Sequence, residues 1–136
     1  MSIIMEKILK IEKLYYSKGS TDLQIEDAQK KLEILFPKDY IEILKTYGAI
    51  SFYGTEWTGL NVDEYIDVIA CTLNARIYSK EFPAKMFVLE ELGIENILIL
   101  CDEEGNIYSW KGGEHKKIAD SLVEYLEMCI CRKINK

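Results

Sequence analysis

The chain holds few side chains whose types and spacing support catalysis. A nucleophile–base pair needs two groups within hydrogen-bond reach, and the base is usually a histidine. The only histidine, His115, follows two glycines in the sequence, so we expect it in a flexible, solvated loop and not in an active site. The glycines form neither a GxGxxG fingerprint nor a phosphate-binding loop. We therefore expect that this protein is not an enzyme and needs no cofactor.

Cysteines are the next candidates for metal or redox chemistry, and the chain has four: Cys71, Cys101, Cys129 and Cys131. They form no CxxC pair, and Cys129 and Cys131 would point to different faces of the helix expected there. A zinc site would also need partner ligands, which a single histidine does not supply. We interpret the cysteines as structural thiols and expect no metal site.

Adjacent carboxylates at Asp102, Glu103 and Glu104 are candidates for acid–base catalysis or calcium binding. They lie in the sequence DEEGN between two apolar runs, which is typical of an exposed hairpin turn. Catalysis by a carboxyl group would need burial to shift its pKa, and a calcium loop would need alternating oxygen ligands that this turn lacks. We predict an acidic surface turn.

Two tryptophans, Trp57 and Trp110, lie beside polar residues near expected strands. Two interpretations stay open. Either the indoles cap the hydrophobic core, or they anchor a protein partner, because an indole combines a large apolar area with one hydrogen-bond donor.

Charge is distributed unevenly along the chain. The net charge is −6, and residues 46–110 hold three basic and eleven acidic residues, a net charge of −8 for that segment. This balance argues against direct binding of nucleic acid, whose phosphates attract lysine and arginine. One interpretation is a solvated surface that maintains solubility. The other is an acidic patch that steers a basic partner protein.

These residues must be positioned by helices and strands that the apolar pattern predicts. Helices are expected over residues 2–19, 24–35, 37–48, 65–79 and 115–134. Strands are expected over residues 49–54, 56–62, 85–92, 96–102 and 107–110. The expected buried stripes include Ile4, Ile8, Ile11 and Tyr15 in the first helix, Leu35 at the end of the second, and Ile66, Ile69, Leu73 and Ile77 in the fourth.

This order of elements predicts an α+β fold with a single domain over residues 1–136. We expect an antiparallel or mixed β-sheet with one face packed against the N-terminal and C-terminal helices. No apolar run reaches the roughly 18 residues that a membrane span needs, and the charged N-terminal segment is unlike a signal peptide. We therefore expect a cytoplasmic protein without a membrane partner.

One segment, FPKDYIEILKTYGAISFYG over residues 36–54, frames the expected fold. Its proline suits the first turn of a helix, and its first glycine is expected to end that helix in the left-handed conformation. The framing positions are Phe36, Pro37, Asp39, Tyr40, Leu44, Tyr47 and Gly48. The segment resembles the signature of the SUKH superfamily of Smi/Knr-type proteins, and ILILCDEEGNIYSWKG and IADSLVEYLE resemble the later hairpin and closing helix of that family. The resemblance covers about residues 20–130.

The resemblance implies an α+β fold and, as in bacterial members, an immunity protein that binds and neutralises a cognate polymorphic toxin, commonly a nuclease. A fungal branch of the family implies the alternative, a non-catalytic regulatory adaptor in cell-wall synthesis. Contacts with a basic toxin are expected from aromatic and acidic residues of the middle segment: Tyr53, Glu56, Trp57, Asp63, Glu64, Asp102, Glu103, Glu104 and Trp110.

Overall fold

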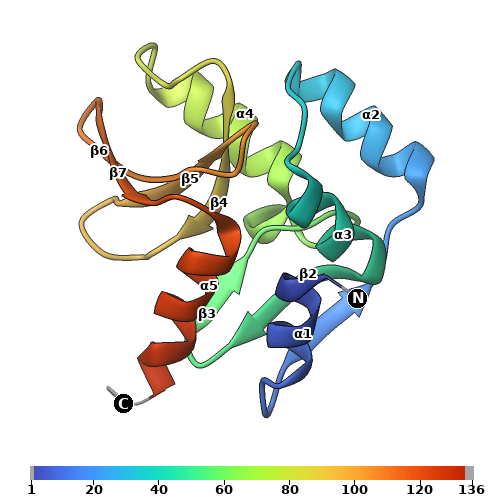
Figure 1. Cartoon of the computed structure of the whole chain (residues 1–136). Coiled ribbons are helices and arrows are strands. Elements are labelled where there is room, and N and C mark those ends of the chain that lie inside the picture. The colour runs from blue at the N-terminus through green and yellow to red at the C-terminus, as the bar shows by residue number, and fades with distance from the viewer. Residues whose placement is uncertain (1, 134–136) are drawn as a thin grey trace.

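Two antiparallel β-sheets lie at the centre of the structure, a computed structural model that describes residues 2–133 (Figure 1). The first sheet has the order β1-β2-β3, with strands β1 (Tyr15–Lys18), β2 (Tyr47–Phe52) and β3 (Thr55–Trp57). The second has the order β4-β5-β6-β7, with strands β4 (Met86–Glu91), β5 (Leu98–Asp102), β6 (Ile107–Lys111) and β7 (Glu114–Ala119).

The longer helices are α1 (Ile3–Leu9), α2 (Asp22–Leu32), α3 (Lys38–Thr46), α4 (Val68–Tyr78) and α5 (Leu122–Ile130). A short 3₁₀ helix, η1 (Glu64–Ile66), leads into α4, and a second one, η2 (Cys131–Lys133), follows α5. In Figure 1, α1 and α5 lie over the near side of the first sheet, and α2 and α4 lie side by side. The expected α+β fold is confirmed.

The two sheets are joined just after β3, at Thr58. Its N–H donates to the carbonyl of Leu89 in β4 (2.8 Å), and its hydroxyl donates to the carbonyl of Val88 (2.8 Å). The carbonyl of Thr58 in turn accepts from the hydroxyl of Tyr40 in α3 (2.9 Å). A buried hydrogen-bond network therefore connects both sheets to α3.

The segment that frames the fold packs in the middle of the main core. The rings of Phe36, Tyr40 and Phe87 meet with centroid separations of 5.1, 4.9 and 4.7 Å. Leu44 is fully buried, one helical turn after Tyr40. Pro37 lies at the N-cap position of α3, where a backbone N–H would have no hydrogen-bond acceptor within the helix, so the lack of one costs nothing.

A capping box begins α2. The hydroxyl of Thr21 accepts from the N–H of Gln24, and the Gln24 side chain accepts from the N–H of Thr21. The helix ends at Leu32 because Glu33 adopts the left-handed conformation (φ 57°). The expected continuation to Leu35 is wrong, and that side chain is exposed.

The N-terminal helix is shorter than expected. Ile4 and Ile8 are buried as the helical pattern requires, but α1 ends at Leu9. Residues 15–18 form β1, and Tyr15 is exposed instead of buried. The physical reason is that consecutive tyrosines favour an extended backbone, and pairing with β2 satisfies the hydrogen bonds of that strand.

Gly48 lies inside β2 and does not cap α3 in the left-handed conformation, so that expectation is wrong as well. The helix ends when Tyr47 becomes extended (φ −130°, ψ 154°). A Cβ at Gly48 would lie 2.1 Å from the hydroxyl oxygen of Ser17 and 2.7 Å from the carbonyl oxygen of Lys18. Glycine is needed here because β1 approaches closely.

The C-terminal helix begins at Leu122, capped by Ser121, and not near His115. Residues 114–119 form β7, and His115 pairs with Trp110 of β6. The expectation of a loop histidine is therefore wrong, although its side chain is exposed. The apolar pattern of the sequence did not predict strand β7, because an edge strand exposed to solvent has few apolar residues.

Helix α4 is placed correctly by the sequence, but its buried face is not the expected one. Leu73 and Ile77 are exposed, whereas Val68, Cys71 and Thr72 are buried. The helix packs on a second face of the β4–β7 sheet, so the sheet is covered by helices on both faces and not on one.

A β-bulge in β4 decides which acidic residue faces which side. The pairing shifts between Val88 and Glu90, so Glu90 points toward the main core and Glu91 toward α4. Glu90 is 2% exposed, and its carboxylate accepts from the hydroxyl of Tyr125 and from the guanidinium of Arg132 (2.8 Å). The bulge thus leaves one carboxylate paired inside the protein and the other at the surface.

Candidate functional site

The side of the first sheet that faces away from the main core presents a row of polar residues. Tyr15, Ser51 and Glu56 are paired directly across β1, β2 and β3, so their side chains share one face. Ile50 and Phe52, which flank Ser51, are buried in the main core, so this row faces away from the core. Tyr15 is 71% exposed.

The segment before α4 forms a wall beside this row. Asn61 turns the chain (φ 59°), and Asp63 and Tyr65 follow it. Together with Tyr16, Glu56 and neighbouring residues they line a hollow of about 350 Å³, which we call the strand hollow.

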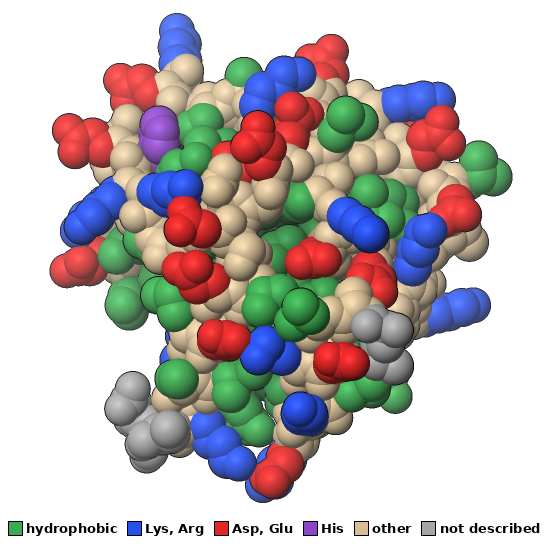
Figure 2. All heavy atoms as spheres, viewed as in Figure 1, with side chains coloured by type: hydrophobic (Ala, Val, Ile, Leu, Met, Phe, Trp, Pro, Cys, Tyr) green, Lys and Arg blue, Asp and Glu red, His purple; other side chains and the backbone are tan. Residues whose placement is uncertain are grey.

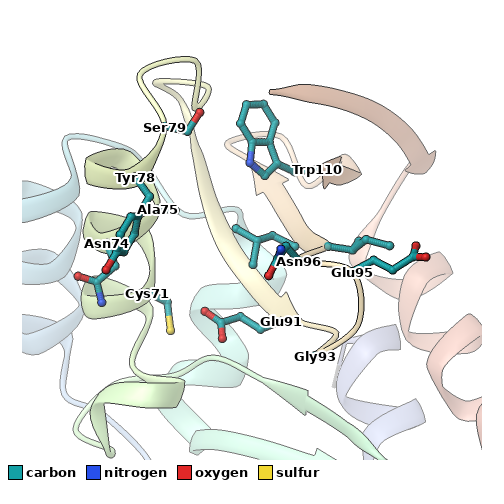
Figure 3. Close-up of a pocket in the computed structure, with 12 residues that line it drawn as sticks. Cys71, Asn74, Ala75, Tyr78, Ser79, Glu91, Gly93, Glu95, Asn96 and Trp110 are labelled. Carbon is teal, nitrogen blue, oxygen red and sulfur yellow. The ribbon is translucent and has the colours of Figure 1, made fainter. Parts of the chain in front are cut away.

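A second row crosses the β4–β7 sheet. Glu91, Leu98 and Trp110 are paired in register across β4, β5 and β6 and face α4. The space between this row and α4 is a groove of about 670 Å³, the helix groove, shown in Figure 3. Helix α4 contributes Cys71, Asn74, Ala75, Tyr78 and the following Ser79 to its wall.

A small hollow of about 90 Å³ lies between the strand hollow and the helix groove. It shares Glu56, Tyr65 and Ile66 with the strand hollow and Glu91 with the helix groove. We call the three adjoining hollows together the acidic groove.

The charge of the acidic groove has one sign. Glu56, Asp63 and Glu91 line it, and their carboxylates make no ion pair or hydrogen bond with any residue between 2 and 133. Among the described residues that line it, none is lysine or arginine. By contrast, the face of the molecule in Figure 2 carries acidic and basic side chains interspersed. The acidic groove therefore suits a cationic partner.

Cys71 is the one thiol among the described residues that line the helix groove. Its thiol donates to the backbone carbonyl of Tyr65 (3.4 Å). Burial, followed by the charges of Glu91 and Asp67, raises the pKa of Cys71 to about 12, so the thiol stays protonated at neutral pH. Within residues 2–133 no group of three or more histidine, cysteine, aspartate or glutamate side chains is arranged to hold a metal ion.

The structure brings Glu56 and Asp63 together in the strand hollow, and Glu64 follows Asp63 in η1 without lining any of the three hollows. Of the other expected contacts, Trp110 alone lines the acidic groove. Tyr53 lies in the turn after β2, where its hydroxyl accepts from the N–H of Glu12 (3.1 Å). It does not line the acidic groove.

The acidic hairpin turn is a separate feature with a structural role. The carboxylate of Asp102 accepts from the backbone N–H groups of Glu104 and Asn106 and from the hydroxyl of Tyr108. The carboxylate of Glu103 accepts from the N–H of Leu35 (2.7 Å), which ties the turn to the segment before α3. Glu104 is exposed.

The two tryptophans differ. Trp57 is fully buried and stacks on Tyr125 (centroids 6.0 Å apart), so its expected role as a surface anchor is wrong and the core interpretation holds. Trp110 is 6% exposed and forms part of the floor of the helix groove. Each indole belongs to a different hydrophobic cluster.

Sequence reasoning missed Tyr15, Tyr16, Tyr65 and Glu91 as groove residues. The tyrosines carried no signal in the sequence, because their exposure became known only from the structure. Glu91 carried no signal in the sequence either, because strict alternation along β4 assigns its side chain to the same face as Phe87 and Leu89. The bulge reverses that assignment.

Fold and groove together define a class: an α+β protein whose main surface feature is an acidic, tyrosine-lined groove. A family model described as SMI1-KNR4 cell-wall, SUKH_6, matches residues 22–126. The chain therefore belongs to the SUKH family. No curated protein matched the sequence. None of the helices within residues 2–133 has both the length and the apolar character needed to cross a bilayer.

Proposed function

We propose that this protein is a bacterial immunity protein, which binds a cognate toxin in the cytoplasm and neutralises it by direct contact, without catalysis. The observation that carries the proposal is the acidic groove, with Glu56, Asp63 and Glu91 unpaired and no cation in its lining. Carboxylates without a neighbouring cation give the groove a negative potential, and such a potential attracts a basic partner. Family membership supports the same role.

A nuclease is the class of toxin that fits this groove best. A nuclease holds phosphates with a basic surface, and an acidic protein that covers that surface excludes the substrate. Charge complementarity then raises the association rate, and the exposed rings of Tyr15, Tyr16 and Tyr65 supply contact area that slows dissociation.

Co-expression is the first test. The chain is produced together with the toxin-like protein encoded beside its gene, and cell survival is scored with and without it. Protection supports the proposal, and no protection from any such protein refutes it.

Charge reversal then tests the contact. With the purified pair, Glu56→Lys combined with Asp63→Lys should lower the association rate about tenfold in low salt, and the loss should shrink in 0.5 M salt. Glu104→Lys combined with Glu114→Lys makes the same change in net charge at two exposed positions outside the acidic groove and serves as the matched control. An equal loss for the control would mean that net charge alone, and not the acidic groove, sets the rate.

The description of the family model favours a second candidate, a regulatory adaptor in cell-wall synthesis. It uses the same surface for a different protein. Sensitivity of a deletion strain to cell-wall stress, with no change in survival against toxins, would select this candidate.

A further inference from the structure

Trp110 provides an unused hydrogen-bond donor in the helix groove. The side chain is 6% exposed, and its indole N–H makes no hydrogen bond with any described residue. In Figure 3 the indole nitrogen turns toward the side of the groove that α4 forms. The nitrogen itself stays accessible from the groove, because it is not among the fully buried side-chain atoms that lack a partner, which within residues 2–133 are Glu42 Oε1 and Trp57 Nε1. An accessible indole N–H on a side chain that is otherwise buried can donate to a backbone carbonyl from outside the chain.

Glu91 provides the matching charge. It lies two strands from Trp110 in the same cross-strand row, a distance of about 10 Å between the strands that carry them. The other glutamate of the groove, Glu95, already pairs with Lys111 (3.1 Å), so Glu91 is the carboxylate without a cation. Leu98 lies between the two and offers an apolar surface.

We propose that the helix groove seats one arginine of an extended segment of the partner. This proposal rests on the proposed function, because it names the part of the toxin that the groove recognises. The backbone carbonyl of the partner's arginine accepts from the indole N–H of Trp110, its methylene groups cover Leu98, and its guanidinium donates to the carboxylate of Glu91. Tyr78, at 89% exposure on the rim of the groove, supplies a ring face for the guanidinium.

Arginine fits this set of partners better than lysine. The guanidinium is planar, donates two parallel hydrogen bonds to one carboxylate and stacks on an aromatic ring. The ammonium group of lysine cannot donate two parallel hydrogen bonds to one carboxylate, and it has no planar face to stack on a ring. A neutral ligand would leave Glu91 desolvated without a cation.

Nuclear magnetic resonance tests the proposal without the toxin. Only two tryptophans are present, so the ¹⁵N-labelled full chain gives two indole N–H signals, assigned through contacts to their strands. The probe is N-acetyl-arginine N-methylamide, which carries both the carbonyl and the guanidinium, and the matched probe is N-acetyl-citrulline N-methylamide, which is neutral and of nearly the same shape. Both are titrated into the wild-type chain, Glu91→Gln and the control Glu104→Gln.

We expect the arginine probe to shift the Trp110 signal in a saturable way and to leave the Trp57 signal in place. Glu91→Gln should weaken binding of the arginine probe about fivefold, which corresponds to about 1 kcal/mol, and should remove the preference over citrulline. Glu104→Gln should change nothing. The proposal is overturned by an unmoved Trp110 signal, by equal affinity for both probes, or by an unchanged affinity in Glu91→Gln.

The same titration separates this proposal from the proposed function. If the chain protects cells but its Trp110 signal does not shift with the arginine probe, the proposed arginine site in the helix groove is overturned and the immunity role is not. A chain that binds the probe through Glu91 but protects against no toxin would overturn the immunity role and leave the chemistry of the groove intact.

Discussion

Replacing Tyr40 tests whether the framing segment serves the fold or recognition. The ring is fully buried between Phe36 and Phe87, and its hydroxyl meets both the carbonyl and the hydroxyl of Thr58. It lies on the core side of the sheets and lines none of the three hollows of the acidic groove. The residue should therefore matter for stability and not for binding.

The size of the effect follows from these contacts. Removing a buried aromatic ring costs about 3–5 kcal/mol, so we expect Tyr40→Ala to lower the free energy of unfolding by about 4 kcal/mol. Tyr40→Phe keeps the ring but leaves the carbonyl of Thr58 without its donor, which costs about 1–2 kcal/mol. Tyr78→Ala, at an exposed position, is the matched control and should change stability by less than about 0.5 kcal/mol.

The pH dependence adds a second check. Burial raises the pKa of Tyr40 well above its usual value of about 10, so the folded chain keeps the phenol neutral where the unfolded chain loses its proton. Wild-type stability should therefore fall above about pH 10 relative to Tyr40→Phe, and the difference between them should stay constant below about pH 9.

Chemical denaturation followed by circular dichroism measures these values, and the association rate with the toxin is measured on the folded Tyr40 variants and on the wild-type chain. A loss below about 1 kcal/mol for Tyr40→Ala would refute the packing argument. Normal stability combined with lost binding would refute the assignment of this residue to the fold.

Two further predictions concern the interior. Arg132→Met should lower the free energy of unfolding by about 2 kcal/mol in denaturant titrations, because it removes the cation from the buried Glu90. The guanidinium is partly exposed, which limits the loss. In a Glu90→Gln background the effect of Arg132→Met should vanish. Iodoacetamide at pH 8 should modify exposed Cys131 and spare buried Cys71, because the raised pKa of Cys71, about 12, keeps it a thiol. Mass spectrometry should therefore find one adduct. Labelling of Cys71 at the same rate as Cys131 would contradict its burial.

The sequence predicted much of the fold because helical and strand patterns are local. Helices α2 and α3 follow from their apolar spacing, and strands β4, β5 and β6 follow from short apolar runs around the hairpin turn. Strands β1 and β7 were missed, because both are exposed edge strands whose extended state depends on pairing with a partner far away in the sequence.

The candidate site was predicted only in part. Glu56, Asp63 and Glu64 were expected from the charge of the middle segment, and the first two line the same hollow, whereas Glu64 lines none of the three. For Trp57 the sequence left two interpretations open, a core residue and an anchor for a partner, and the structure buries it. The sequence could not decide, because a tryptophan near a strand end has the same sequence neighbours whichever face of the sheet it takes.

By itself, the sequence determined the class of fold, the excess of acid in the middle of the chain and the scarcity of catalytic pairs, since all three depend on composition and on spacings of a few residues. Only the tertiary structure decided which carboxylates stand free. A single bulge in β4 turns Glu90 inward to Arg132 and Glu91 outward to the helix groove. The pairing of β4, β5 and β6 then places Glu91 in the same row as Trp110, and α4 forms the opposite wall. Neither choice is local, because both depend on which strand and which helix lie alongside.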